Sequence, residues 1–181
     1  PGTVNNEIGA HEDMLATLLA AAGDPNVKED LLKGKTVGDM TYKVHLDGYN
    51  LMPALKGEAD WPRHDFLYWT DDGNVAAVRY DNWKITFLRQ NAEGIDVWRK
   101  PFEALRAPMI ANLRMDPFER AEHESIGYNR WWADHMFIFA PAGAYVGEWL
   151  QSFREFPPRQ KPGSFNLDNV MEAIAKGGGD K

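Results

Sequence analysis

The residues best suited to metal chemistry lie between positions 122 and 135. Glu122, His123 and Glu124 are consecutive, and Asp134 and His135 follow further along the chain. Carboxylate and imidazole groups bind zinc and related cations, so these five side chains could form a metal site. They lack the pair of histidines four positions apart that marks a helical zinc motif. The pattern therefore favours a solvated approach to a helix over a metal centre.

Two other acidic segments have simple structural explanations. His11, Glu12 and Asp13 lie at the start of a predicted helix, where the helix dipole favours negative charge. Asp71-Asp72-Gly73-Asn74 has the composition of a calcium loop, but the twelve-residue ligand pattern with its terminal Glu is absent. We therefore expect a helix start at the first segment and a hairpin turn at the second.

Aromatic side chains are the third candidate for binding, because the chain has seven Trp among 12% aromatic residues. Trp131 and Trp132 are adjacent, so on a helix their rings point to different sides. We expect one ring in the core and the other at a packing surface, with ligand stacking as the alternative. The aromatic residues around them are Tyr128, Phe137 and Phe139.

Composition restricts the function classes further. The formal net charge of −7 disfavours tight binding to nucleic acid or anionic lipid, because both depend on clustered Lys and Arg. No apolar run approaches the roughly 18 residues of a membrane span. Zero Cys excludes disulfides and thiolate metal sites. Cytoplasmic and periplasmic proteins can both lack cysteine, so the compartment stays open between the two.

Strand patterns dominate the middle of the chain, and helix patterns flank them. This arrangement predicts an α+β fold with a small antiparallel sheet of about four strands. The expected strands are 65–70, 74–80, 83–89 and a fourth that contains Ile95 and Val97, with Phe102 as a further candidate and an extended 109–114 behind it.

Helix periodicity and stop signals place the remaining elements. The stretch 35–47 is expected to be an exposed loop, and the Gly-Gly-Gly tail at 177–179 is expected to be disordered. The expected helices are 11–22, a short one from Asp24 through Leu32, a turn at Leu51–Leu55, 128–139, one that begins near Pro141 and ends before Pro157, and a last one capped by Asn166.

Four segments carry a family resemblance, and they occur in a fixed order: 12–19 (Glu-Asp-Met-Leu-Ala-Thr-Leu-Leu), 45–51 (His-Leu-Asp-Gly-Tyr-Asn-Leu), 77–84 (Ala-Val-Arg-Tyr-Asp-Asn-Trp-Lys) and 112–119 (Asn-Leu-Arg-Met-Asp-Pro-Phe-Glu). Together they resemble the C-terminal part of a bacterial arylsulfatase, in the sulfatase family of the alkaline-phosphatase-like superfamily. The tail 155–162 resembles a subset of these enzymes, so the resemblance covers nearly the whole chain.

The resemblance implies a division of the chain and a role for it. Residues 1–59 would form a helical edge and connection from a catalytic domain, and 60–181 the C-terminal sulfatase subdomain, which supports that domain. The parent enzyme would hydrolyse sulfate esters with a formylglycine nucleophile and a divalent cation, with calcium expected. Its partners would be its own catalytic N-terminal part and an aryl sulfate substrate.

The chemical groups that sulfatase catalysis needs are not found in this sequence. The formylglycine is made from Cys or Ser within Cys/Ser-x-Pro-x-Arg, and none of Ser125, Ser152 and Ser164 has that context. Asp81-Asn82 matches the Asp-Asn metal ligands in letters, but it is predicted to be a strand turn. We therefore expect no catalytic, cofactor-binding or metal-binding residue here, and no sulfatase activity from the chain alone.

Several readings remain beside this one. The chain opens at Pro1 with no initiator Met or signal peptide, which predicts a segment cut from a longer protein. Such a fragment would expose apolar helix faces at 11–22 and 145–156 and could self-associate. The parent could also be a phosphonate or phosphate ester hydrolase of the same superfamily. A different class is a standalone binding module for carbohydrate or aromatic ligands, built on Trp61, Trp69, Trp98 and Trp131.

Overall fold

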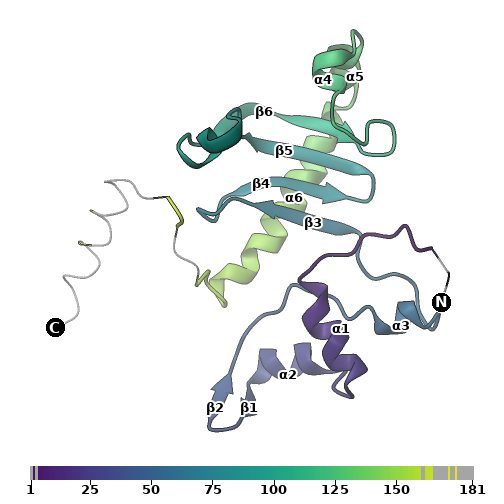
Figure 1. Cartoon of the computed structure of the whole chain (residues 1–181), viewed down its shortest axis with the longest axis vertical. Helices are drawn as coiled ribbons and strands as arrows, with labels where there is room; N and C mark the ends of the chain where they lie inside the picture. The colour runs from purple at the N-terminus through teal and green to yellow at the C-terminus, as the bar shows by residue number, and fades with distance from the viewer. Residues whose placement is uncertain (1, 3, 160–161, 165–170, 172–173, 175–181) are drawn as a thin grey trace. The chain divides into compact units, whose positions relative to one another are not determined.

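The computed structural model describes residues 2, 4–159, 162–164, 171 and 174. Figure 1 shows short helices, a two-stranded hairpin and a four-stranded antiparallel sheet, which confirms the expected α+β class. The chain divides into two compact units, each described separately below. Unit 1 contains residues 1–66 together with 149–156, and unit 2 contains residues 67–148 together with 157–181.

Unit 1 is mainly helical. The expected helix 11–22 is observed as α1 (Asp13–Ala21), and the next two as α2 (Val27–Lys33) and α3 (Met52–Leu55). Its small core contains Ala16, Val27 and Leu51. The short segment Gln151–Arg154 forms a 3-10 helix, η3.

The expected loop at 35–47 is wrong in its first half. Strands β1 (Lys35–Val37) and β2 (Met40–Tyr42) pair antiparallel, with Val37 opposite Met40. That register leaves a two-residue turn of Gly38 and Asp39, and Gly38 has a φ of 61°, which glycine adopts without strain. Thr36 and Val37 before the turn and Thr41 and Tyr42 after it are residue types that favour the extended conformation.

A late part of the chain returns to unit 1. Lys43 Nζ lies 3.1 Å from Glu155 Oε1, and the rings of His45 and Phe156 are 5.8 Å apart. Residues 43–45 therefore contact residues 155–156, although more than half of the sequence separates them. Unit 1 is built from two separate stretches of chain.

The sheet of unit 2 is a meander in the order β3-β4-β5-β6. The expected strands 65–70, 74–80 and 83–89 are confirmed as β3 (Asp65–Trp69), β4 (Val75–Tyr80) and β5 (Trp83–Arg89). The buried residues at the centre of the sheet are Ala77, Val78, Ile85 and Ile110.

The expected fourth strand around Ile95 and Val97 is wrong. Those residues form a 3-10 helix, η1 (Gly94–Trp98), in which Asp96 N–H donates to the carbonyl of Glu93 at 3.2 Å. The strand that pairs with β5 is β6 (Glu103–Asn112), which includes most of the expected extended segment 109–114. Trp83 is opposite Asn112 at the far end of this pairing.

The helices after the sheet are shorter than expected. The predicted helix 128–139 is divided into α5 (Tyr128–Asp134) and a 3-10 turn, η2 (Met136–Ile138), and α4 (Ala121–Glu124) precedes it. The helix expected near Pro141 is α6 (Phe139–Leu150), which runs along one face of the sheet in Figure 1. The ring of Tyr145 on α6 lies 6.1 Å from that of Tyr80 on β4. The predicted helix capped by Asn166 and the glycine tail lie outside the described residues.

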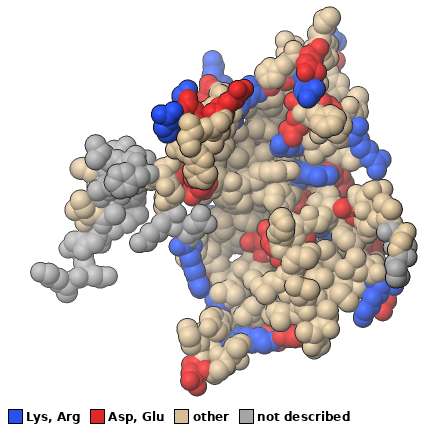
Figure 2. All heavy atoms as spheres, viewed as in Figure 1, with Lys and Arg blue, Asp and Glu red and all other residues tan. Residues whose placement is uncertain are grey.

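Charged side chains of both signs are interspersed on the face of the molecule shown in Figure 2. Ion pairs join many charged side chains of the described residues, for example Lys35 with Asp24 and Arg130 with Asp134. Within the described residues, no helix is both long enough and apolar enough to cross a bilayer.

Candidate functional site

The most unusual polar residue of unit 1 is Arg63, which lies just before β3. Its side chain is only 2% exposed, so the guanidinium has lost nearly all of its contact with water. Burial of a charge is costly unless the charge is paired and its hydrogen-bonding groups are satisfied. The surroundings of Arg63 therefore show what this part of the chain is built to hold.

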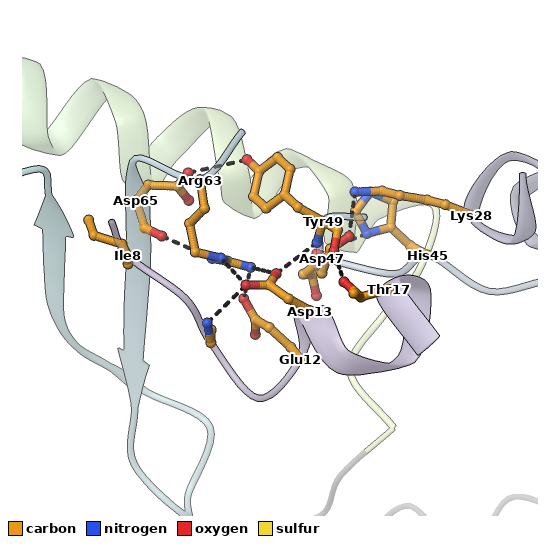
Figure 3. A network of polar contacts seen from close by, with 12 residues as sticks. Ile8, Glu12, Asp13, Thr17, Lys28, His45, Asp47, Tyr49, Arg63 and Asp65 are labelled. Atoms are coloured by element: carbon orange, nitrogen blue, oxygen red, sulfur yellow. Dashed lines mark hydrogen bonds and ion pairs between the residues drawn. The ribbon is translucent and has the colours of Figure 1, made fainter. Parts of the chain in front are cut away.

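Asp13, in the first turn of α1, is the main partner of Arg63 (Figure 3). Arg63 Nε donates to Asp13 Oδ2 at 2.8 Å, and Arg63 Nη2 donates to Asp13 Oδ1 at 2.5 Å. This two-point contact matches the planar guanidinium to the planar carboxylate. The Asp13 side chain is 0% exposed, so both charges of the pair are buried.

The remaining donors of Arg63 are also used. Nη2 donates to Glu12 Oε1 at 2.7 Å, and Nη1 donates to the backbone carbonyl of Asp65 at 2.9 Å. Arg63 also lies over the ring of Tyr49, with its guanidinium carbon 4.7 Å from the ring centre. A cation in this position is attracted to the negative face of the ring.

Asp13 also binds two backbone N–H groups from other parts of the chain. The N–H of Tyr49 donates to Oδ1 at 2.8 Å, and the N–H of Ala10 donates to Oδ2 at 2.9 Å. One carboxylate thus joins the segment before α1, the segment around Tyr49 and the segment before β3. The Tyr49 hydroxyl adds a hydrogen bond to Asp65 at 3.2 Å.

Gly48 permits this arrangement because its backbone lies against that of α1. A Cβ atom at position 48 would be 2.0 Å from the carbonyl oxygen of Glu12, so no larger residue fits. Thr17, one turn further along α1, accepts the N–H of Leu51 at 3.0 Å and donates to the carbonyl of Tyr49 at 3.3 Å. Residues 48–51 are therefore held along α1 by backbone contacts as well as by Asp13.

The two acids differ in their electrostatics. Burial would raise the pKa of Asp13, but hydrogen bonds from Arg63 and from the N–H groups of Tyr49 and Ala10 outweigh it and lower the pKa. Burial raises the pKa of Glu12, because the attraction of Arg63 offsets it only in part and Asp47 and Asp13 add repulsion. Arg63 itself loses hydration through burial, yet its hydrogen bonds to Asp13 hold its pKa above the usual value.

This cluster, formed by Glu12, Asp13, Tyr49, Arg63 and Asp65, is named the Arg63 clamp below. Among the described side chains, no buried polar atom lacks a hydrogen-bond partner. The guanidinium and the Asp13 carboxylate are committed to each other and to the backbone. The clamp is therefore suited to fix three chain segments in place.

Sequence reasoning found Glu12 and Asp13 but missed Arg63. Asp13 does lie in the first turn of α1, as the dipole explanation requires, but its dominant contact is with an arginine 50 positions away. Arg63 follows Trp61-Pro62 with no local pattern that marks it as buried. Only the pairing of the two segments in space identifies it.

The acids of the possible metal cluster at 122–135 pair with arginines. Glu122 contacts Arg89, Glu124 lies 4.0 Å from Arg120, and Asp134 lies 3.0 Å from Arg130. His123 points toward Glu122 at 3.4 Å, and His135 stacks on Trp131 with ring centres 4.4 Å apart. No group of three potential ligands is assembled within the part of the chain that the structure describes.

The segments 71–74 and 81–82 both form turns between strands, as expected. The β3–β4 connection closes with hydrogen bonds between Thr70 and Asn74, and Gly73 has a φ of 81°. Asp81 and Asn82 are the two residues between the paired Tyr80 and Trp83, and Asp81 has a φ of 46°. Both expectations for hairpin turns are confirmed.

Three of the candidate residues, Ser152, Ser164 and Trp61, donate side-chain hydrogen bonds to other parts of the chain. Ser152 Oγ donates to the carbonyl of Trp149 at 2.9 Å, and Ser164 Oγ donates to Asp72 at 2.6 Å. Trp61 Nε1 donates to the carbonyl of Ile8 at 2.6 Å. Trp98 is 79% exposed on η1.

Trp131 and Trp132 both anchor α5 to the sheet. The ring of Trp131 is stacked near that of Trp83 on β5, with centres 6.1 Å apart. Trp132 Nε1 donates to the carbonyl of Pro108 on β6 at 2.9 Å, and its ring lies near that of Phe139. Both rings therefore contribute to packing within unit 2.

No known family model and no curated protein matches the chain.

Proposed function

We propose that this chain is the C-terminal segment of an arylsulfatase and that it stabilises the catalytic part of the parent enzyme, which hydrolyses sulfate esters. The observation that supports this role is the pairing of the four resemblance segments. Segments 12–19 and 45–51 are joined by the contact of Asp13 with Tyr49 and by the close approach of Gly48 to Glu12. Residues of these two segments therefore hold the segments against each other.

Segments 77–84 and 112–119 are joined in the same way. Trp83 pairs with Asn112, and the N–H of Leu113 donates to the carbonyl of Asn82 at 2.7 Å. Lys84 Nζ lies 2.8 Å from Glu119. Residues that keep two chain segments in register serve a supporting role, and this is the role that the resemblance gives to the C-terminal subdomain.

The Asp81-Asn82 turn does not fit the divalent cation of the parent enzyme. Asp81-Asn82 has the letters of the cation ligands, but Asp81 is an exposed turn residue, and the backbone carbonyl of Asn82 accepts the N–H of Leu113, which holds the turn against the end of β6. The nucleophile and the cation site would have to come from the catalytic part. A protein that lacks both loses the groups that stabilise the charge developing at sulfur.

The direct test is turnover of 4-nitrophenyl sulfate by the purified chain with calcium, magnesium or manganese. We expect no release of 4-nitrophenol above the protein-free rate. Metal-dependent turnover that coelutes with the chain through two chromatography steps and is lost in Asp13→Asn would contradict the proposal. A contaminating sulfatase would be unaffected by that substitution.

The second test is the sequence encoded upstream of Pro1 in its gene. We expect a Cys/Ser-x-Pro-x-Arg motif and Asp-Asn ligands in the same reading frame. A different nucleophile sequence upstream would instead favour the alternative, a phosphonate or phosphate ester hydrolase of the same superfamily. A reading frame with neither would contradict the sulfatase assignment.

A further inference from the structure

Unit 2 contains a pocket where β6 ends and α4 and α5 begin. Its volume is about 290 Å³, which is close to the lower limit of about 300 Å³ for small-molecule sites. Most of its lining is apolar. The residues that line it include Ile110, Met115, Ala121, Tyr128 and Trp131, with Asn112, Asp116 and Ser125 as the polar side chains.

The walls of this pocket are fixed by contacts that need no ligand. The Tyr128 hydroxyl donates to the carbonyl of Ile110 at 2.9 Å, which ties α5 to β6. Trp131 is held by its stacking near Trp83 and against His135. A preformed pocket binds more tightly than a flexible one, because little ordering entropy is lost on binding.

Some polar groups that line the pocket already make hydrogen bonds within the chain, and others can bind a ligand. Both carboxylate oxygens of Asp116 accept backbone N–H groups, from Arg120 at 3.0 Å and Ala121 at 2.8 Å. The Asn112 side-chain carbonyl accepts the N–H groups of Arg114 and Met115. The half-buried Asn112 side chain also carries an amide nitrogen, and the exposed Ser125 carries a hydroxyl, and these two groups can hydrogen-bond to a ligand in the pocket.

We propose that this pocket binds a small neutral aromatic molecule of one or two rings. The ring contacts Trp131 and Tyr128, and a polar substituent accepts a hydrogen bond from Asn112 Nδ2 or exchanges one with Ser125. Asp116 is the only charged residue of the lining, so a ring that carries a carboxylate is repelled. The inference is independent of the supporting role, because it uses only residues of unit 2 and needs no catalytic part.

The test is an NMR titration of the ¹⁵N-labelled chain with phenol, indole and benzoate. We expect phenol and indole to cause saturable shifts of the Trp131 indole N–H, assigned with Trp131→Phe, and of the Asn112 side-chain amide. Benzoate should bind at least about tenfold more weakly, which corresponds to about 1.4 kcal/mol.

Two variants test the location. Ala121→Leu places a larger side chain in the pocket and should abolish the shifts, whereas Ala133→Leu on the exposed side of α5 should leave them unchanged. Asn112→Asp keeps the carbonyl that accepts the two backbone N–H groups but removes the donor. It should weaken phenol binding about tenfold or more, and it serves as the second variant if Ala121→Leu loses its dispersed amide spectrum.

Three results would overturn the proposal. They are the absence of saturable shifts with phenol and indole, shifts that persist unchanged in both pocket variants, and shifts with a Gly-Trp-Gly peptide but not with the free rings. The last result would identify the pocket as a docking point for a protein side chain.

Discussion

Glu12 and Asp13 contact the same guanidinium but contribute differently to stability. Asp13 is fully buried with a lowered pKa, while Glu12 is 43% exposed with a raised one. Asp13→Asn leaves the buried Arg63 without its main counter-charge, which typically costs about 3–5 kcal/mol. We expect a large loss in the free energy of unfolding measured in urea.

Glu12→Gln is the matched control for that substitution. It removes a negative charge that contacts the same arginine, but this charge belongs to Glu12, whose ionised form is disfavoured by burial. We expect a change in unfolding free energy within about 1 kcal/mol. Equal losses in the two variants would show that the clamp does not depend on the buried pair.

The opposite pKa shifts of the two acids predict opposite effects of pH. Asp13 has a folded-state pKa below its ordinary 3.8, so its stabilisation is complete above pH 3.8 and is lost as the pH falls through the lowered value. The difference in unfolding free energy between the native chain and Asp13→Asn should therefore shrink as the pH falls below about 4.

Glu12 has a folded-state pKa above its ordinary 4.5, so the folded state prefers its protonated form. The native chain should lose stability relative to Glu12→Gln as the pH rises from 4.5 through the raised value. Urea unfolding of the three proteins at several pH values from about 2.5 to 7 measures both effects. Parallel pH curves for the native chain and both variants would contradict the assigned shifts.

At the scale of elements, the tightest contact is between Gly48 and the start of α1. Gly48→Ala would place a Cβ atom 2.0 Å from the Glu12 carbonyl oxygen, and a backbone atom cannot avoid it by changing rotamer. We expect a loss of about 3 kcal/mol or more in unfolding free energy. Thermal and urea unfolding followed by far-UV circular dichroism measure it.

Gly143→Ala is the control for this prediction. Gly143 lies within α6, and a Cβ atom there would meet no other atom within 4 Å. The substitution should stabilise the helix by about 0.5–1 kcal/mol. If both alanine variants were neutral, the close approach of residue 48 to α1 would be wrong.

Elements with a strong local pattern could be predicted from the sequence. Strand 83–89 was predicted with its observed bounds, because Ile85, Phe87 and their neighbours are β-formers between two clear turns. The strand predicted around Ile95 and Val97 was wrong. These two apolar residues alternate with polar ones as in a strand, but their backbone forms a 3-10 helix. The hairpin β1–β2 has strands of three residues each, too short for periodicity to reveal.

The candidate site was predictable only in part. Glu12 and Asp13 are adjacent acids at a helix start and could be singled out, and the turn roles of Asp72-Gly73 and Asp81-Asn82 follow from residue type. The partnership of Asp13 with Arg63 joins positions 50 residues apart, and the pocket beside Trp131 depends on how α4 and α5 cross the end of β6. Such contacts depend on tertiary packing, which residue order alone does not reveal.

At the scale of the whole molecule, the exposed face of α1 predicts self-association. Met14, Leu15 and Leu18 lie on one side of the helix, and Leu18 is 64% exposed. Apolar residues clustered on a surface favour contact with another protein surface. We expect Leu15→Lys combined with Leu18→Lys to shift the sedimentation profile toward monomer. The two lysines also lower the net negative charge, which by itself would weaken the repulsion between copies and favour association.

The control places the same two charges elsewhere. Ile95→Lys combined with Val97→Lys replaces two exposed apolar residues on η1. This variant should associate to the same extent as the native chain. A native chain that sediments as a monomer at about 100 μM, or equal effects of both double variants, would show that the α1 face is not responsible.

The return of residues 149–156 to unit 1 affects the order in which the chain folds during synthesis. The contact of Lys43 with Glu155 spans 112 positions, so it cannot form until most of the chain has left the ribosome. The meander β3–β6 joins neighbours in sequence and closes as it emerges, because short loops lose little entropy on closure. The N-terminal helices are therefore translated first, but unit 1 is completed only after the sheet.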